Sequence, residues 1–230
     1  MLRTLGAGIL CLVFFGRCAQ QVAPTGGKKD TLAPILTQSI PLNKTLNFKG
    51  NRVELLFDEY VVIDNITSKL IITPTIENPY TFKQNGMSVV LNFKKEFADS
   101  TTYTLNFGDA IKDFAEKNPA KNLKLVFSTG NSLDSGHVQG YVKNILSRKP
   151  LLVVLVGLYE IGDTLPITQQ KPIYFSRTDS SGYFSIENTN IKEYKLMAVE
   201  DKNRNMLYNT KEESIGLVTS PVNTGTDTTR

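Results

Sequence analysis

Four short segments alternate apolar and polar residues with a period of two, and this pattern limits the possible folds more than any other feature. They are residues 52–58, 87–94, 102–108 and 123–128, and each places three large apolar side chains on one side of an extended backbone. Weaker strands are expected at 35–40, 69–73 and 80–83, with proline and Asn-Gly turns between the segments. About seven short strands in a hundred residues, without a helical period, predict a β-sandwich over residues 31–130.

The four strand faces form the expected core. Their residues are Val53, Leu55, Phe57, Val89, Leu91, Phe93, Tyr103, Leu105, Phe107, Leu123, Leu125 and Phe127. Tyr103 opens a strand at the place where a tyrosine corner pins immunoglobulin-like sandwiches, although a plain core tyrosine is an equal alternative. Asn85-Gly86 predicts a hairpin with both residues in the turn, because such turns need two positive φ angles.

The two cysteines, Cys11 and Cys18, both lie at the start of the chain. No later residue can therefore form a disulfide, a zinc-thiolate cluster or a thiol nucleophile. With one histidine, His137, and no tryptophan, the chain also lacks the usual parts of metal hydrolases and catalytic triads.

Residues 1–17 show the order of a secretory signal, since Arg3 precedes an apolar run from Leu5 to Phe15. The run is too short to span a bilayer, which takes roughly 20 helical residues. Cys18 directly behind it resembles the lipid-attachment site of a bacterial lipoprotein, although Arg17 departs from that pattern. The alternative is an ordinary signal peptide cut elsewhere.

Residues 18–30 are polar, contain Gly26 and Gly27, and are expected to be a tether. Removal of residues 1–17 would lower the formal net charge of +4 by two, so basicity gives no argument for nucleic acid as a partner. The resemblance to lipoproteins implies attachment to a membrane through lipid on Cys18. Ala19 in place of an acidic residue favours the outer membrane of the cell envelope.

The period-two pattern resumes after a linker at residues 131–137. Strands are expected at 138–143, 151–159, 173–178, 183–186 and 194–199, with 151–159 buried on both faces. The turn at residues 179–182 and the strands after it resemble the transthyretin-like fold of carboxypeptidase regulatory-like domains. The likeness implies a second sandwich at 138–219, with Asp179 and Gly182 shaping the turn. Residues 220–230 are expected to be a disordered tail.

The first sandwich resembles the bacterial Ig-like domain of the SbsA type, found in envelope proteins. The matching segments are Asp30 to Pro34, Pro41 to Asn43, Val53 to Glu59, Ile71 to Pro74, Thr102 to Leu105, Ile111 to Asp113 and Phe127 to Gly130. Such domains serve as spacers and adhesion modules, and the resemblance implies no catalysis.

Two groups of acidic and amide residues are candidate sites. Asp58, Glu59, Asp109 and Asp113 are the only plausible parts of a carboxylate hydrolase, or they are solvated strand-end acids. Asp201, Asn203, Asn205 and Glu212 have the offsets of an EF-hand calcium loop, although Met206 stands in place of the turn glycine. The alternative is a loop held by Asx-type hydrogen bonds.

The sequence therefore predicts an all-β chain with two tandem sandwiches after a signal peptide, anchored by lipid and without enzymatic activity. Its expected role is that of a structural or binding module, with envelope proteins or polysaccharide as partners. Carbohydrate binding or adhesion is the first alternative, although the absence of tryptophan weakens it. A carboxylate hydrolase is the second.

Overall fold

The computed structural model describes residue 27 and residues 29–225. The expected signal peptide and the lipid-attachment residue Cys18 lie outside the described residues, so both stay predictions. In the part that is described, the protein is built from strands with one four-residue helix, α1 (Ile66–Lys69), and no helix there is long and apolar enough to cross a bilayer.

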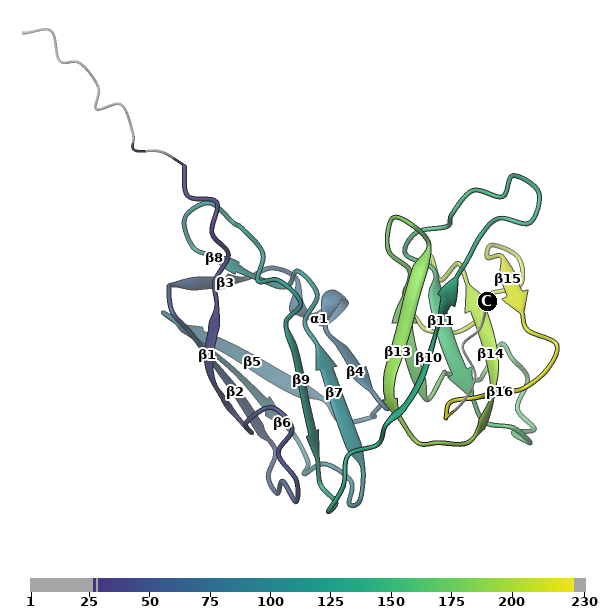
Figure 1. Ribbon diagram of the computed structural model, residues 1–230, viewed down its shortest axis with the longest axis horizontal. Helices are drawn as coiled ribbons and strands as arrows, with labels where there is room; N and C mark the ends of the chain where they lie inside the picture. The colour runs from purple at the N-terminus through teal and green to yellow at the C-terminus, as the bar shows by residue number, and fades with distance from the viewer. Residues whose placement is uncertain (1–26, 28, 226–230) are drawn as a thin grey trace, which may run out of the picture. The chain divides into compact units, whose positions relative to one another are not determined.

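The first sandwich has two antiparallel sheets (Figure 1). One has the order β1-β2-β6-β5, and its strands are β1 (Leu36–Ile40), β2 (Arg52–Phe57), β5 (Tyr80–Asn85) and β6 (Ser88–Phe93). The other has the order β4-β7-β9, with strands β4 (Ile71–Thr73), β7 (Thr102–Asn106) and β9 (Lys124–Ser128). All seven expected strands of this region are confirmed.

The core between these sheets consists of the side chains that the period-two pattern selects. All twelve residues named for the four faces belong to one buried cluster, and none is more than 7% exposed. Because side chains alternate across a strand, the intervening residues point away from this core, and two of them in β7, Thr102 and Thr104, are themselves buried. The packing of the first sandwich is therefore a direct consequence of the alternation.

The hairpin between β5 and β6 is present, but its turn lies one residue later than predicted. Asn85 pairs with Ser88, so the two turn residues are Gly86 and Met87. Only Gly86 has a positive φ, at 61°, which fits a turn with glycine in the first central position. The register follows the core, because a shift of one residue would turn Val89 outward.

Two strands of the first sandwich escape sequence analysis. β3 (Val61–Ile63) and β8 (Ile111–Asp113) pair with each other in a two-stranded ribbon. Three residues are too few to display a period of two, so neither strand leaves a pattern in the sequence.

The second sandwich combines a two-stranded sheet with a larger one (Figure 1). β10 (Gly136–Tyr141) pairs with β13 (Tyr183–Thr189). The larger sheet has the order β12-β11-β14-β15, and β16 also pairs with β14. Its strands are β11 (Leu155–Tyr159), β12 (Tyr174–Arg177), β14 (Glu193–Val199), β15 (Ile215–Leu217) and β16 (Val222–Asn223). A separate core cluster lies between the two sheets.

Three expected boundaries in this region are wrong. The strand predicted at 151–159 begins at Leu155, although all five residues of β11 are buried as expected. The linker ends before Gly136, because Gly136 and His137 belong to β10. The tail expected to be disordered is ordered as far as residue 225: Val222 is buried in the second core and Thr224 is fully buried. Residues 226–230 lie outside the described residues.

Hydrogen bonds confirm the predicted turn at Asp179 and decide between the two alternatives for Tyr103. The Asp179 side chain accepts from the backbone N–H groups of Ser181 and Tyr183 at 2.8 and 3.0 Å, and Gly182 has a φ of 78°. The Tyr103 hydroxyl accepts from the Ala98 N–H at 3.1 Å. Tyr103 therefore forms the corner that the sequence left open between two alternatives.

Tyr103→Phe tests this corner. The substitution keeps the buried ring and removes the acceptor of the Ala98 N–H, so we expect the free energy of unfolding to fall by about 1 kcal/mol. Urea denaturation measures the change. Tyr80→Phe is the matched control, since the Tyr80 ring packs on Phe93 and its hydroxyl makes no hydrogen bond within the described part of the chain. Equal losses in the two variants would contradict the corner.

Candidate functional site

The four acidic residues named for a hydrolase lie in the first sandwich, and three have contacts that hold the fold. Asp58 accepts from the Ile35 N–H at 2.8 Å and so fixes the start of β1. Asp109 pairs with Lys69 at 2.9 Å. Asp113 is buried at the end of β8. Glu59 follows Asp58 directly and also has an interaction within the protein.

Asp113 organises the loop that follows it. One carboxylate oxygen accepts from the N–H groups of Glu116 and Lys117 at 2.6 and 2.9 Å, and the other accepts from Asn118 at 2.8 Å. Burial alone would raise the pKa of Asp113, but these N–H donors together bring it below its ordinary value. A carboxylate occupied in this way is a loop anchor and is poorly placed to act as a general acid.

An ion cluster beside α1 has a similar structural role. Asp64 accepts from the ammonium groups of Lys112 and Lys69 at 2.6 and 2.8 Å. The Lys112 ammonium, and then that of Lys69, hold the pKa of Asp64 at about 2. Because Lys69 also contacts Asp109 and Lys112 belongs to β8, the cluster ties the region of α1 to β8 and to the segment before it.

The predicted calcium loop connects β14 to β15, and its first residue has a cationic partner. The Asp201 side chain is fully buried, and its Oδ2 accepts from Arg177 Nη2 at 2.8 Å. Its Oδ1 has no partner in the described part of the protein. Burial and then the nearby Asp201 carboxylate raise the pKa of Tyr159.

The amide oxygens of the same loop are used in turns. Asn203 Oδ1 accepts from the Asn205 N–H at 3.0 Å, and Asn205 Oδ1 accepts from the Leu207 N–H at 2.8 Å. These are the Asx-type bonds of the alternative interpretation. Met206 has a φ of 62°, the backbone conformation that the missing glycine would supply.

Glu213, one residue after the predicted ligand Glu212, holds the loop closed. Its two carboxylate oxygens accept from the N–H groups of Lys202 and Asn209 at 3.0 and 2.9 Å, and the residue is buried. The sequence alone does not indicate this role, because two adjacent glutamates differ only in the direction in which the backbone turns them. The calcium site stays a prediction.

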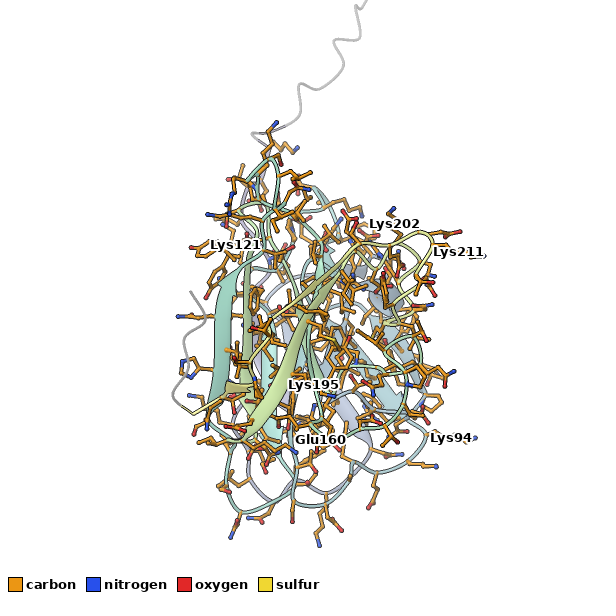
Figure 2. The ribbon with its side chains drawn as sticks, turned by 90° about the vertical axis from the view of Figure 1, so that its right-hand side faces the viewer. Lys94, Lys121, Glu160, Lys195, Lys202 and Lys211 are labelled. Carbon is orange, nitrogen blue, oxygen red and sulfur yellow. The ribbon has the colours of Figure 1, made fainter. Side chains whose placement is uncertain are left out.

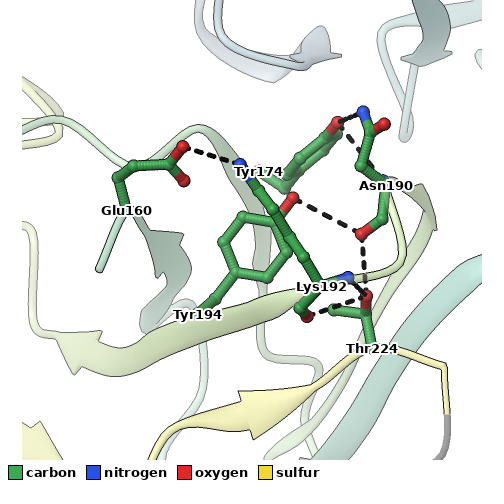
Figure 3. Close-up of polar contacts among 6 residues, drawn as sticks. All are labelled: Glu160, Tyr174, Asn190, Lys192, Tyr194 and Thr224. Carbon is green, nitrogen blue, oxygen red and sulfur yellow. Dashed lines mark hydrogen bonds and ion pairs between the residues drawn. The ribbon is translucent and has the colours of Figure 1, made fainter. Parts of the chain in front are cut away.

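A network of polar side chains at one end of the second sandwich also escaped sequence analysis (Figure 3). Thr224 Oγ1 donates to the Asn190 carbonyl at 2.8 Å, and the Asn190 side chain donates to the Tyr174 hydroxyl at 3.0 Å. Lys192 Nζ pairs with Glu160 at 2.6 Å. Tyr194 is fully buried beneath this network, and burial chiefly raises its pKa. The network fastens the C-terminal strand and carries no exposed reactive pair.

Two clefts lie beside β14 and β15 in the second sandwich. One has a volume of about 480 Å³ and includes Lys195, which Figure 2 shows on β14, among mainly apolar residues. The other has a volume of about 610 Å³ and reaches the segment that follows β10. Both fall in the usual size range of small-molecule sites. Within residues 29–225, no three or more His, Cys, Asp and Glu side chains come together in a group that could hold a metal ion.

The fold and these contacts define a class, that of tandem all-β proteins whose acidic residues serve mainly as structural anchors. Residues 30–129 match the model of a family described as bacterial Ig-like domain. This match confirms the expected Ig-like character of the first sandwich. The transthyretin-like resemblance of the second sandwich stays a prediction. No curated protein sequence matches the chain.

Several solved structures resemble the chain weakly. An L,D-transpeptidase from Mycobacterium smegmatis shares 12% identity over 71% of this chain and 75% of its own, with a TM-score of 0.30. The N-terminal part of the bacterial S-layer protein SbsC shares 13% identity over 82% of this chain and 45% of its own, also with a TM-score of 0.30. BcpA, the major pilin subunit of Bacillus cereus, shares 13% identity over 79% of this chain and 62% of its own, with a TM-score of 0.24. At such scores these structures carry no functional argument.

The calcium hypothesis has a direct test in thermal unfolding. Because Arg177 already neutralises Asp201, we expect the full chain to unfold at the same temperature in millimolar calcium chloride and in chelator. Circular dichroism follows the transition. A midpoint several degrees higher in calcium, lost in an Asp201→Asn variant, would establish the predicted site.

Proposed function

We propose that the chain is a non-catalytic structural or binding module of a bacterial cell envelope, attached to a membrane through lipid on Cys18. The observation that carries the proposal is the bacterial Ig-like match over residues 30–129. The contacts of Asp113 add to it, because the most buried acid of the first sandwich is committed to three backbone N–H groups.

The lipid anchor is the finer part of the proposal and depends on the sequence alone. The apolar run from Leu5 to Phe15 precedes Cys18, and a polar stretch separates Cys18 from the first sandwich. Two or more acyl chains give stable attachment, whereas one gives only marginal binding. The outer membrane is the proposed location, with a bilayer and neighbouring envelope proteins as partners.

Mass spectrometry of the mature N-terminus from isolated membranes tests the anchor. We expect a chain that begins at Cys18 and carries acyl groups, and a Cys18→Ala variant that loses them and leaves the membrane fraction. The variant leaves both sandwiches unchanged, so its far-ultraviolet circular dichroism should match that of the parent after detergent extraction. An unmodified N-terminus at any other residue would remove the lipid anchor.

Carbohydrate binding is a second candidate, and one observation favours it. The Tyr60 and Phe114 side chains are both more than 60% exposed. Their backbones meet, since the Phe114 N–H donates to the Tyr60 carbonyl at 2.9 Å. Exposed aromatic rings beside the paired strands β3 and β8 offer a surface on which the apolar face of a sugar can stack.

A glycan array tests this candidate. If the aromatic pair binds a polysaccharide, Phe114→Ala should weaken the strongest array signal about tenfold, which is the effect of losing one important contact. Phe82→Ala is the control, because Phe82 is a partly exposed phenylalanine of β5, in another sheet of the same sandwich. An array without any bound glycan would leave only the structural role.

A further inference from the structure

The segment that joins β10 to β11 is an ordered hairpin that extends beyond both strands (Figure 1). The Asn144 N–H donates to the Lys149 carbonyl and the Arg148 N–H donates to the Asn144 carbonyl, each at 2.9 Å. Asn144 Oδ1 accepts from the N–H groups of Leu146 and Ser147 at 3.1 and 2.9 Å. One asparagine therefore fixes the shape of the tip.

The tip presents apolar side chains to solvent. Ile145 is 80% exposed and Leu146 is 89% exposed, the two highest values among the large apolar residues described. Single exposed leucines are common on protein surfaces. Two adjacent exposed apolar residues, here an isoleucine and a leucine, are unusual at the apex of a hydrogen-bonded turn, since polar residues and glycine normally occupy such places.

The segment that returns from the tip to β11 keeps two more apolar residues outside. Leu152 and Val153 are exposed, and Val153 has a φ of 62°, an uncommon conformation for a β-branched residue. Thr178 imposes it: the Val153 N–H donates to the Thr178 carbonyl, and the Thr178 hydroxyl donates to the Leu151 carbonyl at 2.7 Å. Such strain persists only where surrounding contacts enforce it.

Cationic side chains surround this apolar tip. Lys143, Arg148 and Lys149 lie on its two arms, and no acidic residue occurs between Val142 and Tyr159. None of the ion pairs found in residues 29–225 involves these three cations. The exposed ring of Tyr141 lies at the base, with Lys143 Nζ 5.9 Å from its centroid.

We propose that this hairpin, residues 143–153, inserts into the surface of an anionic lipid bilayer. The order from tip to base is apolar, then cationic, then aromatic. The apolar tip fits the acyl chains, and the cations and the tyrosine behind it fit the interfacial region, where the headgroup phosphates lie. The cations fit negatively charged headgroups, each contributing to attraction near the surface. This contact is independent of the lipid proposed on Cys18.

The chain supplies a clean probe, because it contains no tryptophan. In a full chain with Cys18→Ala, which removes lipid attachment, Leu146→Trp places one fluorophore at the tip. Vesicles of phosphatidylcholine with phosphatidylglycerol should shift its emission to shorter wavelength, and brominated acyl chains should quench it. Adding Ile145→Ser should lower the partition coefficient about tenfold, because an apolar side chain no longer enters the bilayer.

Ile191→Trp is the matched control. Ile191 is 60% exposed in the same sandwich, at the opposite end of the β10–β13 pair from Tyr141. We expect its emission to stay unchanged. An unshifted Leu146→Trp spectrum, an equal shift at position 191, or an equal response to pure phosphatidylcholine would each overturn the proposal. A shift in the emission of Leu146→Trp, with no shift for Ile191→Trp, supports insertion of the hairpin whether or not Cys18 carries lipid.

Discussion

The aromatic contacts of Phe97 are the interaction that holds the two sheets of the first sandwich together. Its ring lies 4.7 Å from those of Phe93 and Tyr103 and 5.0 Å from that of Phe127, measured between centroids. Phe93 belongs to one sheet, and Tyr103 and Phe127 belong to the other. Aromatic pairs at such separations stabilise beyond their buried area. Phe97 therefore joins two sheets that contain no disulfide.

The loops around this core are held by side chains that accept hydrogen bonds from backbone N–H groups. Asp113, Asn144 and Asp179 each accept from two or more N–H groups within five residues along the chain. Glu213 does the same across a longer loop. In a region without cysteine, such contacts are a simple means of fixing a loop. These four side chains therefore have a structural role.

The sequence predicts the parts of the fold that have a long enough period. Strands of five or more residues with alternating burial, such as β2 and β6, are visible because three side chains repeat on one face. The paired strands β3 and β8 are not, because three residues display no repeat. Their position depends on pairing, which no local pattern encodes.

The site residues were harder to predict for a different reason. The spacing of Asp201, Asn203, Asn205 and Glu212 shows which oxygens a loop could offer, but not which partners already use them. Arg177 lies 24 residues before Asp201 and reaches it only because β12 and β14 both pair with β11. The same limit applies to Leu151 and Leu152, which read as buried strand residues. Thr178, a distant residue, holds this segment outside the sheet.

The two ends of the second sandwich show that the exposed apolar hairpin is not required by the fold. At one end, Gly136 leaves no room for a side chain, since an added Cβ would lie 2.5 Å from the Thr189 carbonyl oxygen. Thr224 and Tyr194 close that end with buried polar contacts. At the other end, Ile145 and Leu146 at the tip of the hairpin between β10 and β11 are 80% and 89% exposed, and neither belongs to a core cluster. The apolar side chains at this tip lie largely out of contact with the rest of the protein, and their exposure to water is unfavourable. A feature that the core does not need, and that water disfavours, is best explained by contact with something outside the chain.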